Sequence, residues 1–250
     1  MLRQPMTAPT QQYDPNGNSP TASAIGPWTV YGRMQIKKIR VESNRLVVEG
    51  QRIGMKFSDH AKLLVPTKLD EKVRLEISLS QPVNSADQVH EIFSHLFVFS
   101  KEEFLASVPE FWRWYLTKYL DSYEEDGTRL VFKPYVPEKI QPKKASADPE
   151  APKDGIFHVG NGVTAPKPRY QPDPDYPAVA KREGFVGHPV FTMIVDKTGS
   201  VSKPVLVQPA GLGLDENAYQ AMRTWKFQPA TRNGQPVAVE VNAEFTFDLY

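Results

Sequence analysis

The sequence predicts an α+β protein made of two small domains. Stretches with a strand-like alternation of apolar and polar residues, and stretches with a helix-like spacing, occur in both halves of the chain. A proline-rich segment with few large apolar residues separates the halves. The chain has 250 residues, of which 40% are hydrophobic, so it can bury one large core or two smaller ones. The polar segment between the halves favours two.

Composition excludes some functions. The formal net charge is +1, with lysines and arginines scattered among acids, so we expect no nucleic-acid partner. Cysteine is absent, which excludes disulfides and thiolate metal sites. We find no apolar run of the length that a membrane helix needs, and we expect this polypeptide to be soluble. A signal or membrane anchor upstream of Met1 stays open.

The first domain is expected over residues 28–136. Residues 1–27 are rich in Pro, Ser, Thr, Asn and Gln, which predicts a disordered lead. Period-2 alternation follows from Trp28, and its phase slips at Lys37 and Lys38, which indicates a β-bulge. The stretch "VRLEISLS" reads as a strand with one buried face.

Two helices are expected next in this domain. Ser85 precedes Gln88 by three residues and Ser100 precedes Glu103 by three, which is the spacing of a capping box. An aromatic face then runs through residues 104–119, and we interpret it as core. A strand around "TRLVFKPYV" completes the domain.

Residues 137–172 are expected to form a proline-rich linker, followed by a second domain over residues 173–250. The predicted order in that domain is helix, strand, strand, helix, strand. Gly199 supplies the turn between the first two strands, and Pro204 places the second strand at an edge or a bulge. The last strand is unusually long, with apolar residues at every second position from Val237 to Leu249.

No pattern in the chain predicts an enzyme or a cofactor site. His90 and His95 are five residues apart on a predicted helix, so their rings point to different sides and do not share a metal ion. No serine lies in a G-x-S-x-G turn. We therefore expect no catalytic residues, no metal and no cofactor, with an enzyme in residues 28–136 as the remaining alternative.

The C-terminal region, about residues 160–250, resembles the C-terminal domain of energy-transducing TonB proteins. The resemblance rests on the stretches "YPAVAKREGFVGHPVFTMIVDKTGSV" and "GLDENAYQAMRTWKFQPATRNGQPV" and on the long final strand. Its motif positions are Tyr176, Pro177, Gly184, Gly187, Asp196, Gly199, Leu214, Asp215, Trp225, Phe227, Pro229, Ala230, Gly234, Pro236 and Val237. The resemblance implies a small α+β fold in the periplasm. It also implies an outer-membrane TonB-dependent receptor as partner, and inner-membrane motor proteins if an anchor is missing from this chain.

The chain departs from that family in two ways. No N-terminal membrane helix is visible, and Asp173 and Asp175 stand where the best-known members have a glutamine-containing receptor contact. We therefore expect receptor choice to differ. The alternative function is a periplasmic structural or adaptor protein that uses the same fold for self-assembly or envelope contact, without energy transduction.

The expected site residues form two groups. The partner-binding group lies on the long final strand and just before the domain's first helix: Asp173, Asp175, Val237, Val239, Val241, Ala243 and Phe245. The structural core group is Tyr176, Gly199, Trp225, Phe227 and Pro229. Residues 236–249 are expected to leave part of one edge open for an added strand from a receptor or a second copy. The alternative is a strand fully paired within its own sheet.

Overall fold

The computed structural model describes residues 1–20, 26–123, 130–133 and 155–249. These residues fall into two compact units. Unit 1 comprises Met1–Pro109, Leu116–Pro134 and Gly211–Gly213, and unit 2 comprises Glu110–Tyr115, Tyr135–Ala210 and Leu214–Tyr250. The expected domains, residues 28–136 and 173–250, have different limits and stay a prediction.

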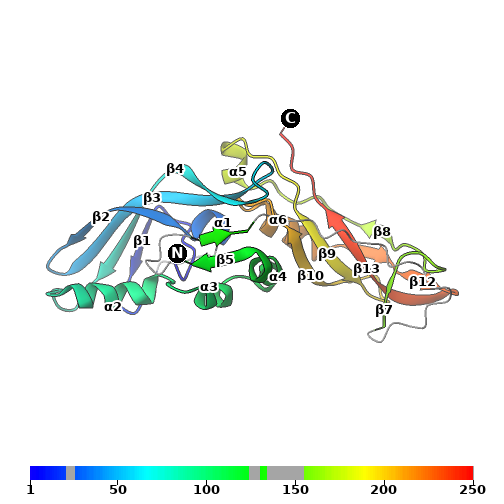
Figure 1. Cartoon of the computed structure of the whole chain (residues 1–250), viewed down its shortest axis with the longest axis horizontal. Helices are drawn as coiled ribbons and strands as arrows, with labels where there is room; N and C mark the ends of the chain where they lie inside the picture. The colour runs from blue at the N-terminus through cyan, green and yellow to red at the C-terminus, as the bar shows by residue number, and fades with distance from the viewer. Residues whose placement is uncertain (21–25, 124–129, 134–154, 250) are drawn as a thin grey trace. The chain divides into compact units, whose positions relative to one another are not determined.

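Unit 1 is built on a four-stranded sheet in the order β1-β4-β3-β2 (Figure 1). The strands are β1 (Thr10–Tyr13), β2 (Met34–Val41), β3 (Arg45–Ser58) and β4 (Leu63–Ser78). The pairs β2 with β3 and β3 with β4 are antiparallel, whereas β1 runs parallel to β4. The ladder between β2 and β3 shifts between Ile36 and Lys38, which confirms the predicted bulge.

Helix α2 (Ala86–Leu96) covers one face of this sheet. It begins as predicted, because Ser85 accepts a hydrogen bond from the backbone N–H of Gln88. Helix α3 (Lys101–Ser107) begins in the same way at Ser100. The core between the sheet and α2 contains Leu46, Val48, Val73, Leu75, Ile77, Ile92, Leu96 and Phe97.

The structure differs from the expected disordered lead in residues 1–20. Leu2, Met6 and Tyr13 are buried in the sheet–helix core, and β1 pairs with the edge of β4. The buried guanidinium of Arg52 donates from Nη1 to the carbonyl oxygen of Met6 at 2.9 Å. The N-terminal residues are therefore ordered by a few well-spaced apolar residues and by backbone hydrogen bonds. The average composition of this segment does not show these contacts.

The remaining elements of unit 1 are short. They are α1 (Trp28–Tyr31), the last residues of α4 (Glu110–Tyr119), β5 (Leu120–Tyr123) and β6 (Leu130–Phe132). Trp28 is buried, with its ring 5.2 Å from that of Phe104 in an edge-to-face arrangement. The aromatic residues expected in the core are buried at Phe104, Phe111, Trp112, Tyr115 and Tyr119. The first six residues of α4 belong to unit 2.

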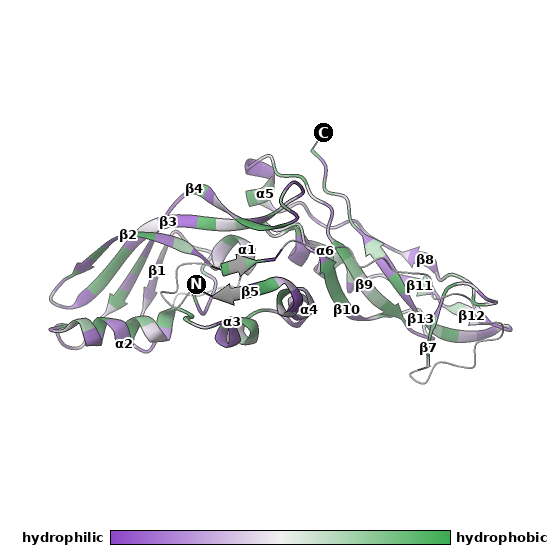
Figure 2. Cartoon of the chain, in the orientation of Figure 1, coloured by the Kyte–Doolittle hydropathy of each residue, from purple (hydrophilic) through white to green (hydrophobic). Residues whose placement is uncertain are grey.

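Unit 2 shows the predicted order of helix, two strands, helix and final strand. The elements are α5 (Ala178–Arg182), β9 (Val190–Val195), β10 (Val201–Gln208), α6 (Leu214–Met222), β11 (Lys226–Gln228), β12 (Ala230–Arg232) and β13 (Gln235–Glu244). The sheet order is β10-β9-β13-β12, so β10 is an edge strand, with a register shift around Pro204 as predicted. Along these strands apolar and polar residues alternate (Figure 2).

Part of the expected linker forms strands of unit 2. Residues 137–154 lie outside the described residues. Strand β7 (Ile156–His158) pairs with β13, and β8 (Lys167–Tyr170) pairs with β11. None of the helices in the described ranges has the length and apolarity that a membrane crossing requires.

Candidate partner-binding edge

Strand β13 has one face in the core of unit 2 and one face in water. Val237, Val239 and Ala243 are buried and Val241 is half-buried, while Glu240, Asn242 and Glu244 are exposed. The alternation continues beyond the strand, with Phe245 and Phe247 buried and Asp248 exposed. The side chains that face the core fix the strand in place, so its edge keeps a defined geometry.

One edge of β13 is occupied by β9 over the second half of the strand. Residues Val239 to Glu244 pair antiparallel with Val195 to Val190. Past the end of the strand, the N–H of Phe245 donates to Pro189 O at 3.0 Å, and that of Phe247 donates to Gly187 O at 3.1 Å. The odd-numbered residues of this segment therefore direct their backbone groups toward β9.

The opposite edge is occupied only over a short stretch. Strand β7 pairs in parallel with Ala238 to Glu240 on this edge, whereas β12 pairs with Gln235 to Val237 on the side of β9. After Glu240, no strand in the described part of the chain pairs with this edge. We call the side of residues 241–247 that faces away from β9 the open edge.

The open edge has a definite set of backbone donors and acceptors. Because hydrogen-bonding direction alternates along an antiparallel strand, the even-numbered residues point away from β9. These are Asn242, Glu244 and Thr246, all exposed. Asn242 also accepts a hydrogen bond at Oδ1 from Thr192 Oγ1 on β9, at 2.9 Å, which holds its side chain over the sheet face rather than the edge. The arrangement offers up to three N–H and three C=O groups to an extended chain.

The charge around the open edge is negative. Glu240, Glu244 and Asp248 are exposed on the wet side of the strand. The pKa of Tyr176 is raised by burial and by the negative charge of Asp248. Acidic side chains limit indiscriminate strand pairing and favour a partner segment without like charges opposite them.

Asp173 and Asp175 are exposed and lie in the irregular segment before α5. The carbonyl oxygen of Asp175 accepts a hydrogen bond from Asn217 Nδ2 of α6 at 2.7 Å. Neither aspartate has a hydrogen bond to β13 among the described residues. The structure therefore brings the strand residues of the predicted partner site together and joins Asp175 to α6 instead.

The residues expected in the structural core support the open edge from behind. Trp225 and Phe227 are buried, and Trp225 Nε1 donates to Pro172 O at 3.1 Å. The hydroxyl of Tyr176 donates to Phe185 O at 2.5 Å, and its ring lies 5.5 Å from that of Phe247. Pro229 is half-buried next to β12.

Gly199 holds the turn between β9 and β10 with a φ of +84°. Its carbonyl accepts a hydrogen bond from the N–H of Phe227 at 2.8 Å. The turn is thereby joined to the segment that follows α6.

Sequence reasoning missed a pair of acids at the start of α6, of which Asp215 is buried and Glu216 is half-buried. Asp215 is fully buried and accepts a hydrogen bond at Oδ1 from the Ala210 N–H at 2.8 Å. Glu216 accepts one at Oε1 from Trp112 Nε1 at 3.0 Å, while its buried Oε2 has no hydrogen-bond partner among the described residues. Burial, together with the charge of Asp215, raises the pKa of Glu216 to about 8. Acids in the first turn of a helix are normally solvated, so only the contact with Trp112, far away in sequence, reveals this pair.

Comparison with known proteins identifies the region that contains this edge. The family description "Gram-negative bacterial TonB protein C-terminal" matches residues 172–249. Residues 172–249 therefore match the TonB C-terminal family. The resemblance found in the sequence is confirmed, as is the α+β fold with its order of elements.

Relatives of this chain include proteins named TonB. The one from Vibrio cholerae is 30% identical over 112 residues, which is 43% of this chain and 45% of the relative. The one from Xanthomonas campestris pv. campestris is 37% identical over 78 residues, covering 30% of this chain and 34% of the relative. This chain thus spans less than half the length of either protein. A solution NMR structure of the Pseudomonas aeruginosa TonB CTD is also similar, with 22% identity, a TM-score of 0.30, and coverage of 36% of this chain and 89% of that one.

Proposed function

We propose that this TonB C-terminal domain binds a short extended segment of an outer-membrane receptor, which adds as a strand to the open edge of β13. The observation that carries the proposal is the one-sided pairing of residues 241–247, which β9 holds on one side only. Strand addition uses backbone hydrogen bonds for affinity and the side chains at alternate positions for selectivity. The chain acts in this account as a binding protein in TonB-dependent transport, without catalysis.

The proposal sets a limit on the length of the added strand. Residues 238–240 are already paired by β7 on this edge, so a partner gains access first to Asn242, Glu244 and Thr246. A segment of five to seven residues matches this length, at about 3.3 Å per residue. A longer segment would have to displace β7, which holds β13 through only three residues.

The location in this proposal is the periplasm, where an outer-membrane receptor presents its inner segment. Energy transduction would further require inner-membrane motor proteins and a membrane anchor. The proposed receptor selectivity involves Asp173 and Asp175, which are exposed and take part in no ion pair with other described residues.

The same open edge fits a second copy of the domain, which is the adaptor or self-assembly alternative. Two copies related by a twofold axis would pair their open edges antiparallel. The acids Glu240, Glu244 and Asp248 would then approach their counterparts, and like charges across a sheet are destabilising. This repulsion favours a receptor segment over a homodimer.

A proline substitution tests the proposal. Asn242→Pro removes one outward N–H, and proline is tolerated on an edge strand when that N–H faces solvent. We expect the variant to keep its fold and to bind a synthetic peptide of a TonB-dependent receptor about tenfold more weakly. Asn242→Ala is the matched control, because it also loses the contact with Thr192 but keeps the backbone N–H. Equal peptide affinity of the two variants would contradict strand addition here, and sedimentation equilibrium on the same samples tests the homodimer.

A further inference from the structure

Unit 1 contains a cavity of about 620 Å³ that the TonB-domain function does not use. It lies between strands β2, β3 and β4 and the end of α2. Phe93, Phe97 and Phe99 form an aromatic wall, and the rings of Phe93 and Phe97 meet edge to face at 5.4 Å. Met34, Ile36 and Ile53 line it from the strands. A volume of this size and an apolar lining are typical of small-molecule sites.

The charged groups of this cavity are all positive. Arg33 and Lys68 line it, together with the polar side chains of Gln35 and Thr67, and no lining residue is acidic. Arg33 Nη1 lies 2.9 Å from the sulfur of Met55, and Lys68 takes part in no ion pair in the described part of the chain. An apolar cavity with cations and no acid is complementary to a molecule that has an apolar body and an anionic group.

The apolar lining continues out of the cavity along β2. Ile36 lines the cavity and is 40% exposed, and Ile39 and Val41 on the same strand are 43% and 51% exposed. The bulge between Ile36 and Lys38 brings all three to one face of the strand. This exposed apolar track is about 15 Å long at the usual rise of a strand. A straight apolar chain would cover it.

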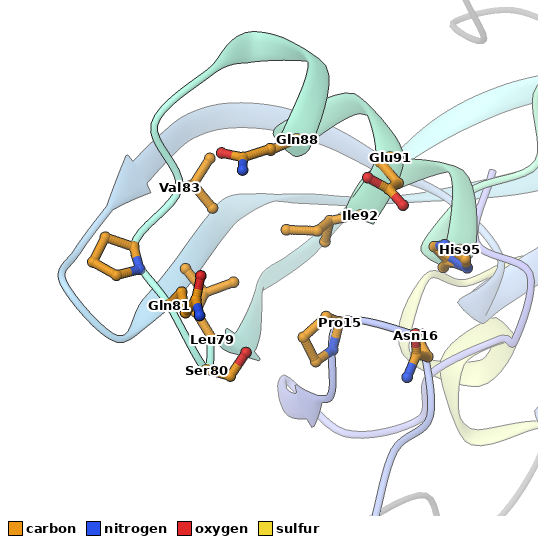
Figure 3. Close-up of a pocket in the computed structure, with 11 residues that line it drawn as sticks. Pro15, Asn16, Leu79, Ser80, Gln81, Val83, Gln88, Glu91, Ile92 and His95 are labelled. Atoms are coloured by element: carbon orange, nitrogen blue, oxygen red, sulfur yellow. The ribbon is translucent and has the colours of Figure 1, made fainter.

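A smaller cavity in unit 1 serves as a comparison (Figure 3). It has a volume of about 280 Å³, and Gln88, Glu91, Ile92 and His95 of α2 line it opposite Asn16. It combines an acid, an imidazole, amides and apolar side chains, so no one class of ligand is favoured there.

We propose that the larger cavity binds a single-chain acidic amphiphile such as a fatty acid. The anionic head lies near Arg33 and Lys68, and the acyl chain contacts the phenylalanine wall and leaves along Ile36. This site is independent of the open edge of β13, because every residue that lines it belongs to unit 1. It assigns a ligand-binding role to the N-terminal unit.

The test is a titration of the full chain with palmitate. Binding is measured by the displacement of the fluorescent probe 1-anilinonaphthalene-8-sulfonate. We expect the wild type to bind palmitate, and Lys68→Gln to weaken binding roughly twofold to fivefold. Lys72→Gln is the matched control, because Lys72 is exposed on the same strand and lies outside the cavity. The affinity for the uncharged analogue 1-hexadecanol should be the same in all three proteins.

A second pair of variants tests the path of the acyl chain. Ile36→Glu places a carboxylate beside the expected chain and should abolish palmitate binding, whereas Val41→Glu, at the far end of the track, should weaken it less. Circular dichroism checks that each variant is folded. The proposal is overturned if the folded wild type does not displace the probe with palmitate, if Lys72→Gln weakens binding as much as Lys68→Gln, or if only anionic phospholipid vesicles bind.

Discussion

The indole ring of Trp225 lies nearly parallel to the ring of Phe245, with their centroids 5.0 Å apart and an angle of 29° between them. This contact joins the segment that follows α6 to the segment that follows β13, directly behind the open edge. Trp225→Ala is expected to lower the free energy of unfolding by about 3–5 kcal/mol, because it leaves a cavity in the core. Urea denaturation of the variant measures the loss. A loss below about 1 kcal/mol with receptor binding abolished would instead make Trp225 a binding residue.

Gly199 allows a second prediction with a matched control. A Cβ atom built on Gly199 would lie 1.9 Å from Phe227 O, and the residue has a φ of +84°. Gly199→Ala is therefore expected to cost about 2 kcal/mol or more, from strain and from the clash. Gly234 has a φ of +77° but open space around its Cβ position, so Gly234→Ala should cost only about 1–2 kcal/mol. Equal losses in thermal unfolding would show that the contact with Phe227 is unimportant.

Glu216 should make the stability of the protein depend on pH. Its pKa rises from 4.5 to about 8 in the folded state, so between these values the folded state keeps a proton that the unfolded state releases. The contribution of Glu216 to the free energy of unfolding is fully present below a pH of about 4.5, and it falls as the pH rises toward 8. Glu216→Gln should remove this dependence and be more stable than the wild type near pH 8. Denaturation at several pH values measures the difference, with the exposed Glu244→Gln as control. If the stability of the wild type and of Glu216→Gln changed with pH in the same way, the raised pKa of Glu216 would be contradicted.

Strand β7 should limit the part of β13 that a partner reaches. Replacement of Ile156–His158 by Gly-Ser-Gly removes the side chains that stabilise β7, including the ring of Phe157 under the Arg232 guanidinium at 5.3 Å. We expect faster hydrogen exchange at Ala238 and Glu240 and tighter binding of a long receptor peptide. Val159→Ser, which changes an exposed residue just after β7, is the control and should alter neither. Unchanged exchange in the replaced protein would show that β7 does not protect β13.

Local features of the fold could be predicted from the sequence. The helix starts at Ser85 and Ser100 were correct, because a capping side chain and the N–H that it accepts from are three residues apart. The bulge near Lys37 was visible in the phase of alternating residues. In the same way, alternation along β13 gave the face that packs on the core.

Features that depend on contacts between distant residues could not be predicted. The order of residues 1–20 depends on Arg52, and the burial of Glu216 depends on Trp112. The long alternating strand predicted an open edge but not its limits, because the covering strand β7 comes from a segment that reads as linker. The composition of that segment contains no signal for the pairing.

Hydrogen exchange at individual amides of β13 tests the central claim most directly. The amides of Asn242, Glu244 and Thr246 should exchange rapidly in the free monomer and become protected when a receptor peptide binds. The amides of Phe245 and Phe247 donate to Pro189 and Gly187 and should be protected in both states. If the three outward amides are already protected in the free monomer and no partner changes them, the open edge does not exist in solution and the account is wrong.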